Sequence, residues 1–289
     1  MTLTLAIGIA TGCVYALVAV GYSLIYRTTG VVNFAQGTYV MIGGFATWWF
    51  FAVAVLPYPL AIAMGVGVAT LLGLALWTIV VLPLWRRRSP GYVVLLATIV
   101  FGVIVGNGAL LLLGSLPQTL PPWVPGLVFH FQGSRIDGQY GLIIVATLLL
   151  LAGCGAVLRS SPLGRAMRAC AASRETSQLL GISPERVGAL SFAATAALGG
   201  LGGAMITPAQ FTSSDVGLAY GVFGFVAAVL GGFGSLVGAL VGGLLLGCIN
   251  AAVGRYVSSN YQTVIAFAIL LGLLAVRPRG IVGRNWEDT

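Results

Sequence analysis

Charge is scarce in this sequence of 289 residues: only 7% of the residues are charged, against 58% that are hydrophobic. Soluble domains carry roughly 25% charged residues, because water has to solvate their folded surface. A chain with so little charge cannot cover a water-facing surface of its own size. The composition therefore excludes a soluble globular protein and predicts one whose solvent is lipid.

Residues that carry out chemistry are also few. The sequence has no lysine, a single histidine, and 4 cysteines that lack metal-ligand spacing. It shows no carboxylate pair, no metal-binding cluster and no Ser/His/Asp set. We therefore expect no enzyme activity, no catalytic residues and no metal site. The net charge of +8 does not indicate nucleic-acid binding, because the arginines lie between apolar segments.

Apolar runs fill most of the chain, and a helix of about 20 apolar residues crosses a bilayer. The runs are Leu3–Tyr26, Val31–Leu56, Leu60–Leu84, Tyr92–Leu113, Tyr140–Leu158, Val187–Ile206, Gly217–Gly232, Leu236–Val253 and Tyr261–Val276. The expected fold class is an all-α polytopic membrane protein, a single transmembrane domain over residues 1–289 with interrupted helices. It has nine spans, or eight if Gly30–Gly37 interrupts one helix.

The arginines predict the orientation, because cytoplasmic loops of membrane proteins collect basic residues. With nine crossings and the tail Arg277–Thr289 inside, 12 of the 14 arginines are cytoplasmic, and only Arg135 and Arg255 are outside. The short run Gly217–Gly232 also fits a re-entrant element, but this would place five further arginines outside. We therefore expect it to cross, with the C-terminus cytoplasmic.

Two connections are long, an outer loop at about 114–139 and a cytoplasmic loop at about 159–186. In the cytoplasmic loop, Ser161-Pro162 is typical of a helix start, Leu163–Leu180 of a helix, and Gly181 of a left-handed stop. Ser183-Pro184 then begins another helix. The loop helix mixes charge with apolar residues that have no lipid to meet. It is either a solvated connector or a docking element for a cytoplasmic partner.

The predicted spans hold no Asp, Glu, Lys or Arg deep in the membrane. Ion-coupled carriers usually place ionisable groups there, so energy, if used, comes from another subunit. The richest polar cluster lies between Thr28 and Gly37 and contains Asn33 and Gln36. Unwound backbone at membrane depth has to be buried in protein or line a wet cavity, and a half-helix N-terminus there suits a carboxylate. Alternatively, the two amides cap a helix or bridge helices.

Four stretches resemble LivH-type permeases, the membrane subunits of branched-chain amino acid ABC importers (the HAAT family). They are Gly30-Val31-Val32-Asn33-Phe34-Ala35-Gln36-Gly37 with Tyr39 and Met41-Ile42-Gly43; Gly164-Arg165-Ala166-Met167-Arg168-Ala169-Cys170-Ala171 with Leu179-Leu180-Gly181-Ile182 and Arg186-Val187; Ala228-Val229-Leu230-Gly231-Gly232-Phe233-Gly234-Ser235; and Arg277-Pro278-Arg279-Gly280-Ile281. They follow in order and span nearly the whole chain. One departure is Ala172-Ser173, where relatives often carry an acidic residue; the nearest acid here is Glu175.

The resemblance implies a permease of the bacterial inner membrane that translocates branched-chain or related amino acids. It implies as partners a LivM-type second permease, two cytoplasmic ABC ATPases of LivG and LivF type, and a periplasmic or lipid-anchored solute-binding protein. ATP and Mg are then bound by the ATPases, and this chain holds no cofactor. The expected pathway residues are Asn33, Phe34, Gln36, Gly37 and Asn107. The expected ATPase-coupling residues are Arg165, Arg168, Glu175, Leu179, Leu180 and Gly181.

Other functions stay open from the sequence. The same architecture also serves urea, short amides or aromatic acids. A function of another class is an ATP-independent channel or facilitator for a small neutral solute, although this leaves Leu163–Gly181 without a role. A membrane enzyme or scaffold is disfavoured, because reactive side chains are so few.

Overall fold

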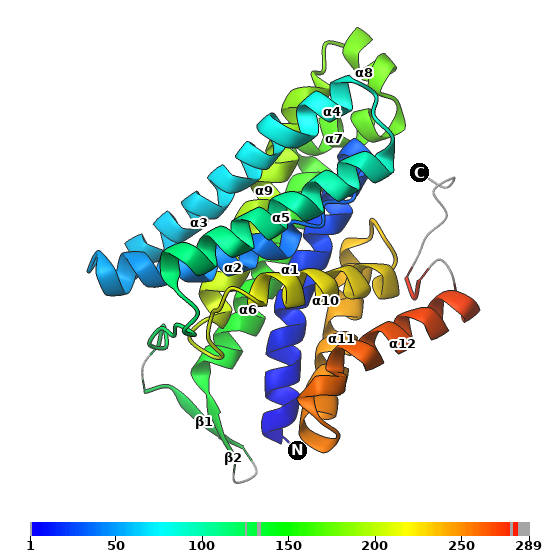
Figure 1. The fold of residues 1–289 in the computed structure, drawn as a ribbon. Helices are drawn as coiled ribbons and strands as arrows, with labels where there is room; N and C mark the ends of the chain where they lie inside the picture. The colour runs from blue at the N-terminus through cyan, green and yellow to red at the C-terminus, as the bar shows by residue number, and fades with distance from the viewer. Residues whose placement is uncertain (1, 125, 132–133, 278–279, 283–289) are drawn as a thin grey trace.

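A computed structural model describes residues 2–124, 126–131, 134–277 and 280–282 of the chain (Figure 1). Over these residues the protein is a helical bundle with one small β-hairpin. The elements are α1 (Thr2–Thr29), α2 (Gln36–Trp48), η1 (Trp49–Val53), α3 (Tyr58–Ala75), η2 (Leu76–Val81), α4 (Leu82–Arg86), α5 (Gly91–Leu113), β1 (Val128–Phe131), β2 (Ser134–Asp137), α6 (Gly138–Ser160), α7 (Pro162–Ala172), α8 (Arg174–Leu179), α9 (Pro184–Ile206), α10 (Val216–Gly231), α11 (Leu236–Tyr256), η3 (Ser259–Tyr261) and α12 (Gln262–Val276).

The helices account for the apolar runs of the sequence. Among the described residues, 7 helices are long and apolar enough to span a membrane. Helices α3 and α4 form one continuous segment, which is π-helical at η2 between them. Helix α2 likewise continues directly into the π-helix η1. To these spans the described chain adds α2 with η1 and the shorter apolar helix α10, and the arrangement confirms the all-α polytopic fold.

The direction of α10 follows from its two neighbours in sequence. Helix α11 runs antiparallel to α1, because Gly8 lies on Cys248 and Gly12 lies on Gly243. Helix α9 also runs antiparallel to α1: its Thr195 carbonyl binds Gln36, whose side chain lies on Gly21, and the later Gly202 lies on Val14. Since α9 and α11 point the same way, the chain has to return between them. Helix α10 makes that return, as we expected of a crossing helix. A re-entrant element would instead leave α9 and α11 pointing in opposite directions.

The two ends of the bundle differ in composition (Figure 1). One end, here called the arginine-rich end, carries α4, α7 and α8 with most of the arginines. The opposite end, the hairpin end, carries the N-terminus, β1 and β2. The outer loop is tied to the body at Gln118, which exchanges two backbone hydrogen bonds of 2.8 Å with Thr212. The tail beyond Val282, and Pro278-Arg279 before it, lie outside the described residues, so its location stays a prediction.

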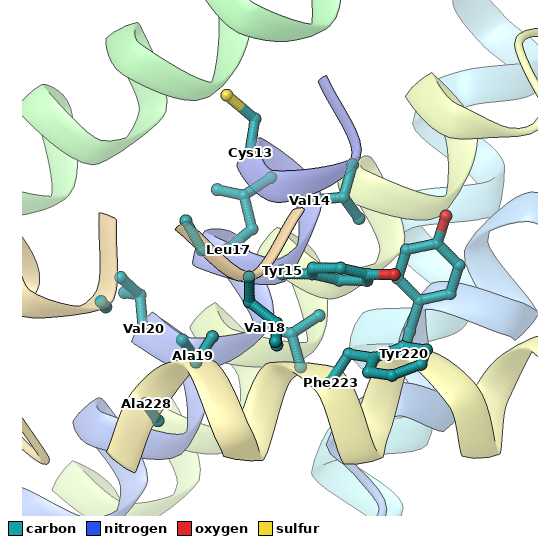
Figure 2. Packing of buried hydrophobic residues seen from close by; sticks show 14 of the residues in the cluster. Cys13, Val14, Tyr15, Leu17, Val18, Ala19, Val20, Tyr220, Phe223 and Ala228 are labelled. Atoms are coloured by element: carbon teal, nitrogen blue, oxygen red, sulfur yellow. The ribbon is translucent and has the colours of Figure 1, made fainter. Parts of the chain in front are cut away.

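Helix α1 is the centre of the bundle, and small residues bring other helices close to it. Gly12 and Gly243 face each other across the α1–α11 contact, so that a Cβ at either would meet the partner's backbone. In lipid, helices gain no hydrophobic drive toward one another, and close packing therefore depends on such residues. Aromatic side chains fill the wider gaps: Figure 2 shows Tyr15 of α1 against Tyr220 and Phe223 of α10, with ring centroids 5.4 and 5.2 Å apart.

Gly203 of α9 tests the same kind of close contact, here between α9 and α2. A methyl group there would collide with the Val40 carbonyl of α2 and lie 2.9 Å from the Gly44 nitrogen, whereas Gly108 of α5 has nothing within 4 Å. Overpacking a tight contact costs about 1–3 kcal/mol. We expect Gly203→Ala to lower the melting temperature of the detergent-solubilised protein and Gly108→Ala to leave it unchanged. Size-exclusion chromatography after heating measures both, and equal melting temperatures would contradict the packing described.

Candidate functional site

The chain breaks between α1 and α2, as the cluster from Thr28 to Gly37 predicted. Gly30 has a φ of +71°, which turns the backbone after the end of α1. The next residues run back beside α1, and the Gln36 side chain lies against Gly21 so closely that a Cβ there would collide with it. Gly21 precedes the last residue of α1 by eight positions, or about 12 Å at 1.5 Å per residue. Helix α2 therefore starts inside the bundle and not at its edge.

The two amides of this break are fully buried and hydrogen-bonded. Asn33 Oδ1 accepts from the Ala35 nitrogen at 3.1 Å, and its Nδ2 donates to the Tyr39 hydroxyl at 3.2 Å. Gln36 Nε2 donates to the Thr195 carbonyl of α9 at 3.2 Å. Gln36 Oε1 is buried with no hydrogen-bond partner in the described chain. Asn33 thus shapes the break, and Gln36 bridges it to α9 with one acceptor left open.

Aromatic side chains form a partly exposed face over the break. This aromatic face consists of Tyr26, Phe34, Phe225 and Phe233. Phe34 lies 5.1 Å from Phe225, Phe225 lies 5.9 Å from Phe233, and Phe233 lies 5.2 Å from Tyr26, all measured between ring centroids. The aromatic face therefore joins the α1–α2 break to the glycine-rich turn after α10.

That turn is the second interruption the sequence predicted, at Gly231–Ser235. Its Gly234 nitrogen donates to Ser23 Oγ at 3.1 Å, two positions along α1 from the Gly21 that touches Gln36. Ser235 then caps α11, its hydroxyl accepting from the Gly238 nitrogen at 3.0 Å. The two interruptions thus lie at nearly the same depth on α1.

The remaining predicted pathway residues have other surroundings. Gly37 packs against α10, where a Cβ would collide with the Gly217 carbonyl and Gly221. Asn107 is exposed on α5, and its Nδ2 donates to the Val103 carbonyl of its own helix at 2.9 Å. The structure therefore brings Asn33, Phe34, Gln36 and Gly37 together and leaves Asn107 apart from them. A pathway role for Asn107 stays a prediction.

The loop helix expected over Leu163–Leu180 is in fact two helices, α7 and α8, so the prediction of one helix was wrong. Ser173 between them is extended, with φ −158° and ψ 124°. Its hydroxyl accepts from the Thr176 nitrogen at 3.2 Å and caps α8, which offsets the break in α7. The predicted caps Ser161 and Ser183 are confirmed: they accept from the Gly164 and Arg186 nitrogens at 3.1 and 3.5 Å.

The predicted coupling residues divide into two groups. Arg165 and Arg168 fold back on α6, donating to the Ser160 and Leu158 carbonyls at its last turn. Cations at a helix C-terminus are favourable because the helix dipole is negative there. Glu175 forms an ion pair of 3.4 Å with Arg88. The first group therefore stabilises the loop itself.

The second group forms the tip of the arginine-rich end. The side chains of Leu179 and Leu180 are 88% and 71% exposed. Gly181 follows with a φ of +77°, which favours glycine and ends α8 as predicted. Two adjacent exposed leucines beside charged residues at this end of the bundle are typical of a contact surface for another protein. Nothing in the described part of this chain covers them.

Sequence reasoning missed a third set of residues at this end, where α1, α4, α8 and α9 meet. Arg86 and Glu185 form an ion pair of 2.6 Å. The Arg174 guanidinium stacks on Trp85 with its Cζ 3.6 Å from the ring centroid. These pairs join residues 89 to 99 positions apart, so local patterns could not reveal them; the one available signal was the run Arg86–Arg88 opposite two acidic residues in the loop.

The chain is similar to known proteins over nearly its whole length. A family model described as "Branched-chain amino acid transport system / permease component" matches residues 4–274. The chain is 34% identical over 293 residues to the high-affinity branched-chain amino acid transport system permease protein LivH of Escherichia coli strain K12, with 96% of this chain and 94% of that protein covered. It is likewise 34% identical over 294 residues to BraD of Pseudomonas aeruginosa, with the same coverage of 96% and 94%.

A more distant relative is the permease protein LivM of Escherichia coli, 24% identical over 298 residues, with 93% of this chain and 68% of LivM covered. No solved structure matches. The helical bundle with its 7 candidate spans among the described residues is consistent with the match to the family model over residues 4–274. This chain belongs to the family of permease components of branched-chain amino acid transport systems.

Proposed function

We propose that this chain is the non-catalytic membrane subunit of an ATP-driven importer for branched-chain or closely related amino acids. The observation that carries the proposal is its similarity, over 96% of its length, to permeases named for branched-chain amino acid transport. Its partners are a LivM-type permease, two cytoplasmic ATPases that hold ATP and Mg, and a periplasmic or lipid-anchored binding protein. It lies in the bacterial inner membrane.

The source of energy is argued from the buried polar groups. Among the residues whose burial is described, no Asp, Glu or Arg side chain is buried, and the buried polar groups are mainly hydroxyls and amides. A proton-coupled carrier normally buries ionisable groups in the membrane to carry its ion. Partner ATPases are therefore the better source of energy than an ion gradient.

The orientation follows from charge. The arginine-rich end is cytoplasmic, because basic residues gather on that side of membrane proteins. The hairpin end is then periplasmic, and nine passes place the C-terminus in the cytoplasm. This orientation puts Leu179 and Leu180 where an ATPase can bind them.

The pathway lies along the aromatic face and the α1–α2 break. Phe34 and its ring neighbours present an apolar surface at the depth where α2 begins, and a LivM-type permease covers the opposite side. Asn33, Gln36 and Gly37 hold this wall in place through their contacts with Tyr39, α9 and α10. A wall of rings and amides without fixed charge suits an apolar zwitterion.

The primary test is uptake by proteoliposomes that contain this chain with its second permease, ATPases and binding protein. Leucine, urea and an aromatic acid are offered side by side, with and without ATP. We expect leucine uptake that requires ATP and every partner. If this chain alone carried leucine at the same rate with and without ATP, the protein would be a facilitator and not an importer subunit.

Leu180 tests the docking surface. We expect Leu180→Asp to insert normally but to weaken ATPase binding about tenfold or more, because loss of a central interface residue costs about 2 kcal/mol or more. Co-purification of the ATPases with the permease pair measures this. Leu116→Asp is the matched control, since Leu116 is 73% exposed at the hairpin end. Undiminished ATPase binding by Leu180→Asp would refute the docking role.

Asn33 tests the break. Asn33→Leu removes the hydrogen bonds to the Ala35 nitrogen and the Tyr39 hydroxyl, each worth about 0.5–1.5 kcal/mol. We expect leucine uptake to fall severalfold while the complex still assembles, as judged by size-exclusion chromatography. The control is Asn260→Leu, at an exposed position of the hairpin end. Unchanged uptake by Asn33→Leu would mean that the shape of the break does not matter for transport.

A further inference from the structure

The last residue of α1 is the meeting point of three helices. The Thr29 carbonyl accepts a hydrogen bond from Arg174 Nη2 of α8 at 2.7 Å and another from Trp85 Nε1 of α4 at 3.2 Å. The same guanidinium stacks on the Trp85 ring, 3.6 Å from its centroid. We call Thr29, Trp85 and Arg174 the Thr29 cluster. It links the arginine-rich tip directly to the end of the central helix.

The chemistry of this cluster favours arginine at position 174. The last carbonyls of a helix lack partners within the helix and carry its negative dipole end, so a cation there is stabilised. A planar guanidinium can stack on an indole and donate to a carbonyl at once, which a lysine ammonium cannot do in the same geometry. Burial against Trp85, together with the nearby charge of Arg88, lowers the pKa of Arg174 below its ordinary value.

The two donors to Thr29 differ in how firmly they are held. Trp85 packs on Trp77 at 5.6 Å, and Trp77 packs on Phe192 of α9 at 5.1 Å, both between ring centroids. Trp85 is therefore part of the bundle core. Arg174 begins α8, a helix of 6 residues between the extended Ser173 and Gly181. Arg174 is thus carried by a short helix that is set off from α7 by the extended Ser173 and ends before Gly181.

The exposed leucines lie at the other end of that same short helix. Leu179 is five residues from Arg174, which is about 7.5 Å along an α-helix. A displacement of Leu179 and Leu180 by a bound protein therefore moves Arg174 with it. An open pocket of about 640 Å³ lies beside the cluster, lined by Trp85, Arg174 and Gln178 among others.

On its other side, the Thr29 cluster adjoins the α1–α2 break. Thr29 Oγ1 donates to the Ile25 carbonyl at 2.7 Å and accepts from the Val31 nitrogen at 3.3 Å. Gly30 then turns the chain, and Asn33 follows four residues after Thr29. A change at the Thr29 carbonyl therefore acts on the residues that set the shape of the break.

We propose that Arg174 is the positioning residue that transmits movement of α8 to the α1–α2 break through the Thr29 carbonyl. The inference rests on the proposed function, in which an ATPase binds α8 at Leu179 and Leu180. Arg174 itself faces into the permease and is not the docking contact. Breaking its link leaves the ATPases bound and able to hydrolyse ATP, but separates hydrolysis from solute movement.

The test uses the complete importer in proteoliposomes and the variants Arg174→Gln, Arg174→Lys and Trp85→Phe. ATPase co-purification, ATP hydrolysis and leucine uptake are measured on each. We expect Arg174→Gln to keep its ATPases while the leucine moved per ATP falls about fivefold or more, the lower range for coupling between sites. Arg174→Lys keeps the charge without the stack, and Trp85→Phe keeps a ring without the donor. For both variants we expect the leucine moved per ATP to lie between the values of Arg174→Gln and wild type. Arg87→Gln is the control, because Arg87 is exposed beside Arg86.

The outcomes separate this inference from the function on which it rests. An unchanged ratio of leucine to ATP in Arg174→Gln overturns the inference, as does loss of the bound ATPases, which would make Arg174 a docking contact. If Arg174→Gln does not fold, Arg174→Lys is compared with wild type instead, and an unchanged ratio of leucine to ATP in that variant overturns the inference. A wild-type complex without ATP-dependent uptake overturns the proposed function instead, before any variant is compared.

Discussion

Close backbone contact around α1 is the constraint on which the rest of the bundle depends. Lipid offers helices no hydrophobic drive toward one another, so their association depends on the fit of their surfaces. Gly12 against Gly243 brings α11 to backbone distance from α1, and Gly203 against Val40 does the same for α9 and α2. The same close fit holds α10 beside α1, where Tyr15 lies on Tyr220 and Phe223.

Helices this close leave little room for water, so the interrupted segments have to satisfy their own polar groups. Asn33 does this for the break between α1 and α2, and Ser23 and Ser235 do it for the turn before α11. Both interruptions meet α1 near Gly21 and Ser23, and the aromatic face spans them. The proposed transport pathway at this depth is therefore lined by rings and amides, without buried charge among the described residues.

Charge is instead concentrated at the ends of the helices, where water solvates it. Arg165 and Arg168 complete the last turn of α6, Arg86 pairs with Glu185, and Arg174 completes the last turn of α1. These contacts turn the loop between α6 and α9 into a fixed part of the bundle with one apolar tip. In the proposed importer, an ATPase bound at that tip would be connected to α1 through short, polar contacts and not through a flexible linker.

The sequence by itself determined the apolar helical segments, the caps Ser161 and Ser183, the stop at Gly181 and the positions of both interruptions, because these depend on neighbouring residues and on composition. It did not reveal that Ser173 splits the loop helix, since a cap and a mid-helix serine look alike without their hydrogen bonds. It placed Asn107 with Asn33 and Gln36, which lie elsewhere in the bundle. The aromatic face and the Thr29 cluster were decided only by tertiary structure, because helices that are apolar all round give no sign of which side chains will meet.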